Sequence, residues 1–232
     1  MTRRPTVYGL DIETDTTING LDPAVARVVT VALSGADFDD VFSGPEGDLL
    51  VELDRALASL PDGVIATWNG AAFDLPFIAD RARLLGVHLG LRLRLDRTMT
   101  LRRSPLPGHA GAYRGAWYNH GHLDAYRLYR ADVGPTLRVS CSLKAIARLV
   151  GLAPIEVDRT RIHDLSNEAL HAYAASDARL ARVLAQRRWP SAARFVDHVD
   201  PDQAETIDIA AHRLARRSIG TDPAGHPVIA SA

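Results

Sequence analysis

Hydrophobic and polar positions in the first third of the chain follow two periods. Short β-branched or aliphatic runs, which are typical of strands, stand at 7–12, 27–33, 39–42 and 64–68. Apolar residues at helical spacing predict helices over 48–60 and 73–85, ended by a Pro-Asp-Gly turn and by Gly86. Strands that then alternate with helices predict an α/β fold, a mixed β-sheet flanked by α-helices.

The rest of the chain is predicted to be mostly helical. Candidate helices run over 125–130, 142–150, 166–188 and 202–217, with Ser166 as the N-cap of the longest. The stretch 86–121 holds Gly, Pro, His and aromatic residues without a clear period, and glycines and prolines after 218 predict a loose tail. We therefore expect one domain over 1–190, followed by a C-terminal helix and tail over 191–232.

Composition narrows the class of protein. The 232 residues are 47% hydrophobic and 24% charged, which indicates a folded domain rather than a disordered chain. A net charge of −1 excludes a histone-like binder but allows a local basic face. One cysteine excludes an internal disulfide and a CxxC zinc site. No run approaches the roughly 18 apolar residues of a membrane span, so we expect a cytoplasmic protein that binds no membrane.

The first acidic motif is Asp11-Ile12-Glu13, at the end of the first predicted strand. Residues two apart on a strand point to the same face, so both carboxylates project together. Two carboxylates held side by side repel each other, and such a pair commonly holds a divalent cation. The alternative is a pair of solvated acids in a turn.

Two further motifs carry acids on other elements. Asn69 to Asp74 lies where a strand gives way to a helix, and the alternative for Asp74 is an ordinary helix-dipole aspartate. Tyr173 and Asp177 lie four apart on one helix face with three small residues between them. The alternative there is an exposed aspartate beside a half-buried tyrosine.

Taken together, four carboxylates on three elements can converge on one point. Oxygen ligands favour hard cations, here Mg²⁺ or Mn²⁺, and four acids can hold two ions about 3.5–4 Å apart. The chemistry that suits such a pair is in-line displacement at phosphorus, with one ion activating water and the other neutralising the leaving oxygen.

These motifs resemble those of a known family. Asp11 to Thr14, Asn69 to Asp74 and Tyr173 to Asp177 look like motifs I, II and III of the DEDD exonucleases, tyrosine subclass. Those enzymes are 3′–5′ exonucleases with a ribonuclease H-like fold, related to the proofreading domains of DNA polymerases. The resemblance runs from about Val7 to Leu184. The segment from Ser142 to Ala147 also resembles the helix that usually precedes motif III.

The resemblance implies a role for each matching position. Asp11, Glu13 and Asp177 would be direct metal ligands, and Asp74 would hold the second ion through water. Tyr173 would orient the attacking water, because a phenol with a pKa near 10 is a poor base at neutral pH. Thr14 and Phe73 would touch substrate, and Asn69 would either brace the site or touch substrate. The position that carries a histidine in the histidine subclass is Ala172, which makes neighbouring His171 a surface or supporting residue.

A basic segment offers a substrate surface. Seven arginines lie between Arg81 and Arg103 with one acid among them, and aromatic residues follow. Arginine can bind phosphate and rings can stack on bases, so Arg102, Arg103, Tyr113 and Trp117 are predicted to contact a single strand. The alternative is a solvated arginine-rich loop. Asp124 is either a fifth active-site acid or a helix N-cap, and the N-cap is favoured.

The predicted function is a metal-dependent 3′–5′ exonuclease that acts on a single-stranded 3′ end, with DNA preferred to RNA as its partner and DNA repair as its setting. Two alternatives stay open. One is a non-catalytic nucleic-acid-binding module on the same fold, and the other is a ribonuclease H-type endonuclease. All four acids are present, which favours catalysis, and the pairing of Tyr173 with Asp177 favours an exonuclease.

Overall fold

The structure, a computed structural model, describes residues 5–101, 104–204, 219–221 and 227–229. Its centre is a seven-stranded sheet in the order β3-β2-β1-β4-β7-β6-β5. The strands are β1 Thr6–Thr14, β2 Val28–Ser34, β3 Asp39–Ser43, β4 Gly63–Thr67, β5 Leu91–Leu95, β6 Tyr113–Trp117 and β7 His120–Asp124. β1, β4 and β7 are parallel to one another and the other pairings are antiparallel, so the predicted mixed sheet is confirmed.

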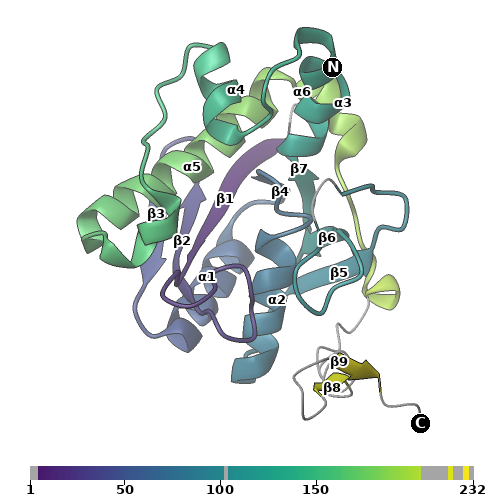
Figure 1. The fold of residues 1–232 in the computed structure, drawn as a ribbon. Helices are drawn as coiled ribbons and strands as arrows, with labels where there is room; N and C mark the ends of the chain where they lie inside the picture. The colour runs from purple at the N-terminus through teal and green to yellow at the C-terminus, as the bar shows by residue number, and fades with distance from the viewer. Residues whose placement is uncertain (1–4, 102–103, 205–218, 222–226, 230–232) are drawn as a thin grey trace.

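Helices cover both faces of this sheet (Figure 1). They are α1 Glu46–Ser59, α2 Asp74–Leu85, α3 Ala125–Leu137, α4 Leu143–Leu149, α5 Asn167–Arg187 and α6 Trp189–Ala192, with short 3₁₀ helices η1 Arg159–Asp164, η2 Ala193–Phe195 and η3 Pro201–Gln203. Ser166 caps α5 as predicted, since its hydroxyl accepts a hydrogen bond from the backbone N–H of Ala169 at 3.2 Å. None of the helices in the described ranges is long and apolar enough to span a membrane.

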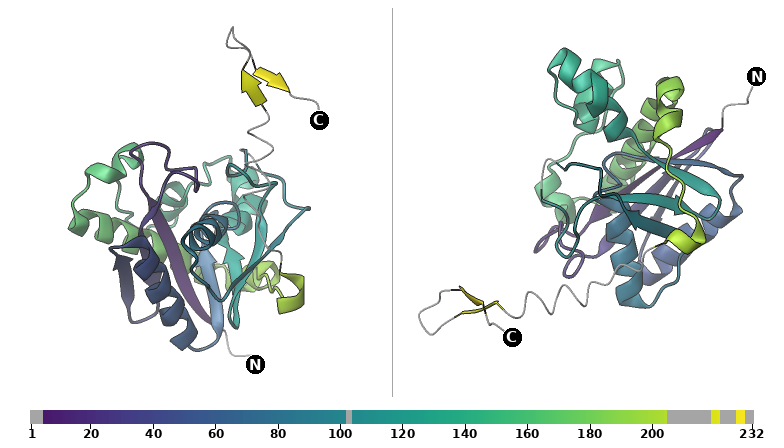
Figure 2. Two further views of the ribbon diagram at one scale, coloured as in Figure 1. Left: turned by 90° about the horizontal axis from the view of Figure 1, so that it is seen from below. Right: turned by 90° about the vertical axis from the view of Figure 1, so that its right-hand side faces the viewer.

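Alternating side chains divide the core into two layers. Tyr8 and Ile65 face α1 and α2, while Val7 and Val64 face the layer that contains α3, α4, α5 and α6. Figure 2 shows the sheet from its edge with helices on either side. Successive residues of a strand point to opposite faces of the sheet, and this alternation separates the two halves of the core.

The prediction of an irregular stretch over 86–121 was wrong. The stretch 86–121 contains β5 and β6, because the Leu-Arg-Leu-Arg-Leu sequence of β5 alternates with period two and pairs with β6. The predicted loose tail contains a pair of antiparallel strands, β8 Ile219–Thr221 and β9 Pro227–Ile229. Of the helix predicted over 202–217, residues 205–217 lie outside the described residues.

The packed body extends past the expected boundary at residue 190. Ala192 is fully buried in the core layer of α3 and α5, and Val199 is also buried. The backbones of Asp197 and His122 exchange hydrogen bonds of 2.7 and 3.0 Å, which joins this segment to β7. Residues up to about 199 thus contribute to the same fold as the sheet.

Close contact between β1 and α5 sets the position of the third motif. A Cβ added at Gly9 would lie 1.9 Å from the backbone oxygen of Ala178, so only glycine lets the helix come this near. Ala174 and Ala178 are buried against Ala32 of β2 on the same face. Small residues on both elements therefore bring α5 down onto the strand that carries the first motif.

We expect the Gly9→Ala variant to be destabilised by about 1–3 kcal/mol or more, because the clash is with backbone rather than with a movable side chain. Gly47→Ala is the matched control, since a Cβ there meets nothing within 4 Å. Urea unfolding monitored by circular dichroism measures both changes. Equal stability of the two variants would contradict the close approach.

Candidate metal centre

Three carboxylates meet where β1 passes under α5. Asp11 and Glu13 lie on the same face of β1 as Gly9, which is the face that contacts α5. Asp177 lies on α5. One carboxylate oxygen from each lies within 4.8 Å of the other two. This set of hard oxygen donors fits a divalent cation such as Mg²⁺ or Mn²⁺.

Asp74 lies next to this trio. It is the first residue of α2, and it is buried. The turn before it depends on Asn69, which adopts a positive φ of 71°, and on Gly70, where a Cβ would lie 2.2 Å from the Thr67 hydroxyl. A hydrogen bond from the backbone of Ile12 reaches the Asp74 carboxylate, so the second motif is tied directly to the strand of the first.

The acids of this centre carry raised pKa values. Burial raises the pKa of Asp11 to about 7, although the charges of Arg159 and Lys144 oppose the shift. Burial and the charge of Asp11 raise the pKa of Glu13, and the same two causes raise that of Asp74. Clustered buried carboxylates are costly as anions without a countercharge, which is the electrostatic condition a divalent cation relieves.

Tyr173 places a phenol at the same centre. Its side chain is 1% exposed and packs against Ile162 and Leu170. Its hydroxyl has no hydrogen-bond partner among the described residues. Burial, and then the charge of Glu13, raises the pKa of Tyr173 above its ordinary value. The phenol therefore keeps its proton and can orient a bound molecule, but it is unsuited to act as a base.

Lys144 is a site residue that the sequence reading did not assign. It lies in α4, whose N-cap Ser142 accepts a hydrogen bond from the backbone N–H of Ala145. The ammonium contacts the carboxylate of Asp177 and sits 4.4 Å from the centroid of the Tyr173 ring. Burial lowers the pKa of Lys144 to about 8. The sequence feature that could have identified Lys144 is its rarity, because it is the single lysine among the chain's 27 cationic residues.

The predicted substrate residues of the first two motifs lie along the same end of the sheet. Thr14 is buried and its hydroxyl donates a 2.7 Å hydrogen bond to the backbone oxygen of Gly20, which holds the loop after β1. Asn69 and Phe73 are half-buried, and the Phe73 ring lies 5.4 Å from that of Phe77. Their contact with substrate stays a prediction.

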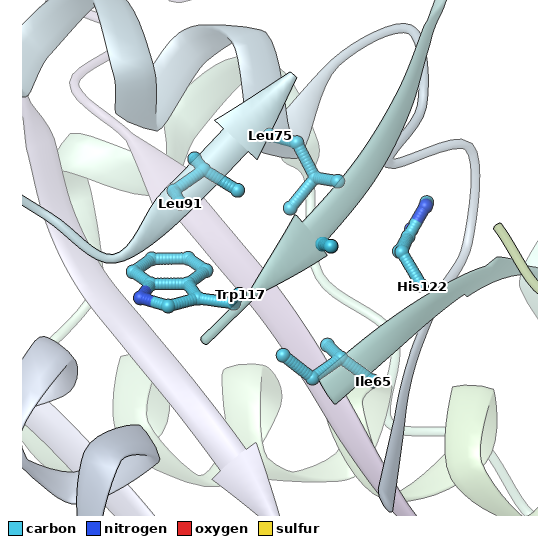
Figure 3. Close-up of a pocket in the computed structure, with 6 residues that line it drawn as sticks. Ile65, Leu75, Leu91, Trp117 and His122 are labelled. Atoms are coloured by element: carbon cyan, nitrogen blue, oxygen red, sulfur yellow. The ribbon is translucent and has the colours of Figure 1, made fainter. Parts of the chain in front are cut away.

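The aromatic residues predicted to stack on bases are instead in the core. Trp117 is 1% exposed and its indole donates a 2.8 Å hydrogen bond to Asp54. Tyr113 is 5% exposed and its hydroxyl lies 2.9 Å from Nδ1 of His109. Figure 3 shows Trp117 and Leu91 among the side chains that line a small pocket. Buried rings cannot stack on a nucleic acid, so this prediction was wrong, and Arg102 and Arg103 lie outside the described residues.

Two arginines of the basic segment form contacts within the folded body of the protein. Arg81 forms an ion pair with Glu46, with Nη2 and Oε2 2.6 Å apart. Arg92 donates to the backbone oxygens of Val199 and Tyr118 at 2.9 and 2.5 Å. The alternative of an entirely solvated loop is therefore also incorrect for these two side chains.

Asp124 is the N-cap of α3, as favoured from sequence. Its Oδ1 accepts hydrogen bonds from the backbone N–H groups of Tyr126, at 3.0 Å, and Asn69, at 2.8 Å. Burial raises its pKa to about 6. Because β4 and β7 are parallel, Asp124 ends its strand at the same edge as the second motif and braces that turn.

The raised pKa of Asp11 predicts how the stability of the metal-free protein depends on pH. Folded Asp11 holds its proton up to about pH 7, whereas in the unfolded chain it releases it near 3.8. The folded state therefore binds more protons in this window, and the free energy of unfolding falls as pH rises through it.

We expect Asp11→Asn to unfold at a higher temperature than the wild type at about pH 8, and the difference to vanish below about pH 4. Thermal unfolding in EDTA measures it. Added Mn²⁺ should reverse the order, because only the wild type keeps the full ligand set and gains binding free energy. An identical pH dependence of the two proteins would refute the burial of this charge.

Comparison with solved structures shows a likeness in fold. No family model and no curated protein matches the chain. The family B DNA polymerase from the hyperthermophilic archaeon Pyrobaculum calidifontis has a similar structure, with a TM-score of 0.60 and 23% sequence identity. The match covers 81% of this chain and 25% of the polymerase chain, so this protein spans about a quarter of its neighbour's length. The likeness and the mixed seven-stranded sheet together confirm the predicted ribonuclease H-like α/β fold.

Proposed function

We propose that this protein is a metal-dependent 3′–5′ exonuclease of the DEDD type, tyrosine subclass, which hydrolyses the terminal phosphodiester of a single-stranded nucleic acid. The observation that carries the proposal is the convergence of Asp11, Glu13 and Asp177 within 4.8 Å near Tyr173, whose buried hydroxyl has no hydrogen-bond partner in the described part of the chain. The likeness to a DNA polymerase supports nucleic acid as the substrate, and DNA in preference to RNA.

Each side chain has a distinct task in this proposal. Asp11, Glu13 and Asp177 would hold Mg²⁺ or Mn²⁺, and Asp74 would hold a second ion through water. Two such ions, when bound, supply Lewis-acid activation of water and neutralise the leaving oxygen. The protonated hydroxyl of Tyr173 would orient the attacking water, because its pKa is too high for proton removal.

The proposed hydrolysis forms one bond to phosphorus and breaks another. The water oxygen forms a new bond to the terminal phosphorus, and the bond from phosphorus to the 3′ oxygen of the preceding nucleotide breaks. That oxygen takes a proton and leaves as a new 3′ hydroxyl, while a nucleoside 5′-monophosphate is released. The ammonium of Lys144, held beside Asp177, adds positive charge where the phosphate would lie.

The Asp11→Ala variant should lose nearly all Mn²⁺-dependent release of nucleotides while keeping its fold, because it lacks a ligand at the centre of the trio. Asp40→Ala is the matched control, since Asp40 is an exposed acid on β3. Release from a labelled oligonucleotide measures activity, and circular dichroism measures folding. Full activity in Asp11→Ala would refute the site.

Tyr173→Phe removes one hydroxyl and preserves the ring, so we expect the rate to drop about 10- to 100-fold, less than for a lost general base. Denaturing gels of a 5′-labelled single strand give the rate and the cutting mode together. A ladder that shortens progressively from the 3′ end supports an exonuclease. Scattered internal cuts favour the ribonuclease H-type endonuclease, and binding without cleavage favours the non-catalytic module.

A further inference from the structure

Arg159 carries a second positive charge to the acidic centre. It is the first residue of η1, in the connection between α4 and α5, and it is exposed. Its guanidinium interacts electrostatically with Tyr173, Glu13 and Asp11. Within the described parts of the chain it forms no hydrogen bond or close ion pair, so its donors are free to bind a ligand.

The short helix that carries Arg159 is fixed on two sides. Ile162 is buried against Tyr173 and Leu170 of α5. His163 joins the loop that follows β1, because its Nδ1 lies 2.8 Å from the hydroxyl of Thr16. These contacts tie η1 to both elements that supply the metal-binding acids, and they hold its first residue close to them.

The start of η1 is also capped. The carboxylate of Asp158 accepts hydrogen bonds from the backbone N–H and the hydroxyl of Thr160, at 3.0 and 2.7 Å. Asp158 is therefore engaged with its own turn and gives Arg159 no close partner. The cap fixes the backbone on which the guanidinium is mounted.

Arg161, two residues further along, provides a contrast. Its Nε lies 2.6 Å from the carboxylate of Asp164, and its electrostatic partners are Asp164 and Asp158 at the surface. One arginine of this helix is thus used in a local surface pair, while the charge of the other acts on the acidic centre. A surface ion pair accounts for the position of Arg161, but no such pair accounts for that of Arg159 among the described residues.

Countercharge to the acids is the simplest task for Arg159, but divalent ions would take over that task when bound. A guanidinium beside metal-neutralised carboxylates then has planar, forked donors available for an anion. Phosphate oxygens match this fork, and charge-assisted bonds of this kind are about twice as strong as neutral ones.

We propose that Arg159 binds the phosphate of the terminal nucleotide, donating to its non-bridging oxygens during hydrolysis. This inference rests on the proposed function and adds a residue that would touch the reacting group. The contact is with the phosphate itself and not with a base or with the upstream strand. Arg159 should therefore matter equally for a long oligonucleotide and for a single nucleotide ester.

The test compares Arg159→Gln, Arg159→Lys and the control Arg161→Gln on two substrates with Mn²⁺. One substrate is a single-stranded oligonucleotide, and the other is the 4-nitrophenyl ester of thymidine 5′-monophosphate, which has no upstream strand. We expect Arg159→Gln to lower kcat/KM about 10- to 100-fold on both substrates, somewhat less than the loss of a buried oxyanion donor. Arg161→Gln should stay within about twofold of the wild type. Lysine should restore part of the loss, because it keeps the charge without the fork.

A Mn²⁺ titration by calorimetry separates phosphate binding from a structural role. Removing a cation from an acidic centre should leave Mn²⁺ affinity unchanged or raise it. Loss of Mn²⁺ binding in Arg159→Gln would overturn the inference. So would activity equal to that of Arg161→Gln, or a defect confined to the oligonucleotide.

Failure of the proposed function gives a different pattern. If the wild type and Arg161→Gln hydrolyse neither substrate, the exonuclease proposal falls. The inference is then judged by binding of thymidine 5′-monophosphate in the presence of Mn²⁺, also by calorimetry. Binding at least tenfold weaker in Arg159→Gln than in Arg161→Gln supports the phosphate contact, and equal binding overturns it.

Discussion

The close approach of α5 to β1 is the constraint on which the candidate centre depends. Gly9 has no Cβ to hold the helix away, and Ala178 brings its backbone into the space that results. One turn earlier on the same helix face stands Ala174, also buried. This spacing brings Asp177 close to Asp11 and Glu13, so three carboxyl groups share one small volume and repel one another when they are ionised. Packing free energy from the sheet and helices must outweigh that repulsion in the metal-free protein.

The cations around the centre show how that repulsion is limited. Lys144 reaches Asp177 from α4, and the charge of Arg159 acts on Asp11 and Glu13 from η1. The two cations do not fully offset the cost of burying the carboxylates, since burial still raises the pKa of Asp11 and of Glu13. A centre with leftover negative charge attracts divalent ions, whereas a fully paired one would resist them. The two cations come from α4 and η1, which are elements outside the sheet.

Much of this arrangement could be predicted from sequence, because its determinants are local. Asp11 and Glu13 are two apart on a strand, and Tyr173 and Asp177 are four apart on a helix, so each pair shares a face by geometry alone. The cap at Ser166 and the turn before Asp74 are local signals of the same kind. The parallel arrangement of β1, β4 and β7 then carries the first two motifs to one edge of the sheet.

The predictions that failed depend on contacts distant in sequence. Trp117 packs in the core, where Asp54 of α1 accepts its indole N–H, and nothing near Trp117 in the sequence indicates that partner. Arg92 similarly finds its acceptor at Val199, far along the chain. Aromatic and basic composition therefore indicated a nucleic-acid surface, whereas the fold buries Tyr113 and Trp117 in its core. Arg159 is the converse case, because Ile162 and His163 dock η1 against α5 and the loop after β1, and its charge therefore acts on the acidic centre. Local pattern identifies the acids that a strand or helix aligns, whereas the cations that complete the centre depend on tertiary packing.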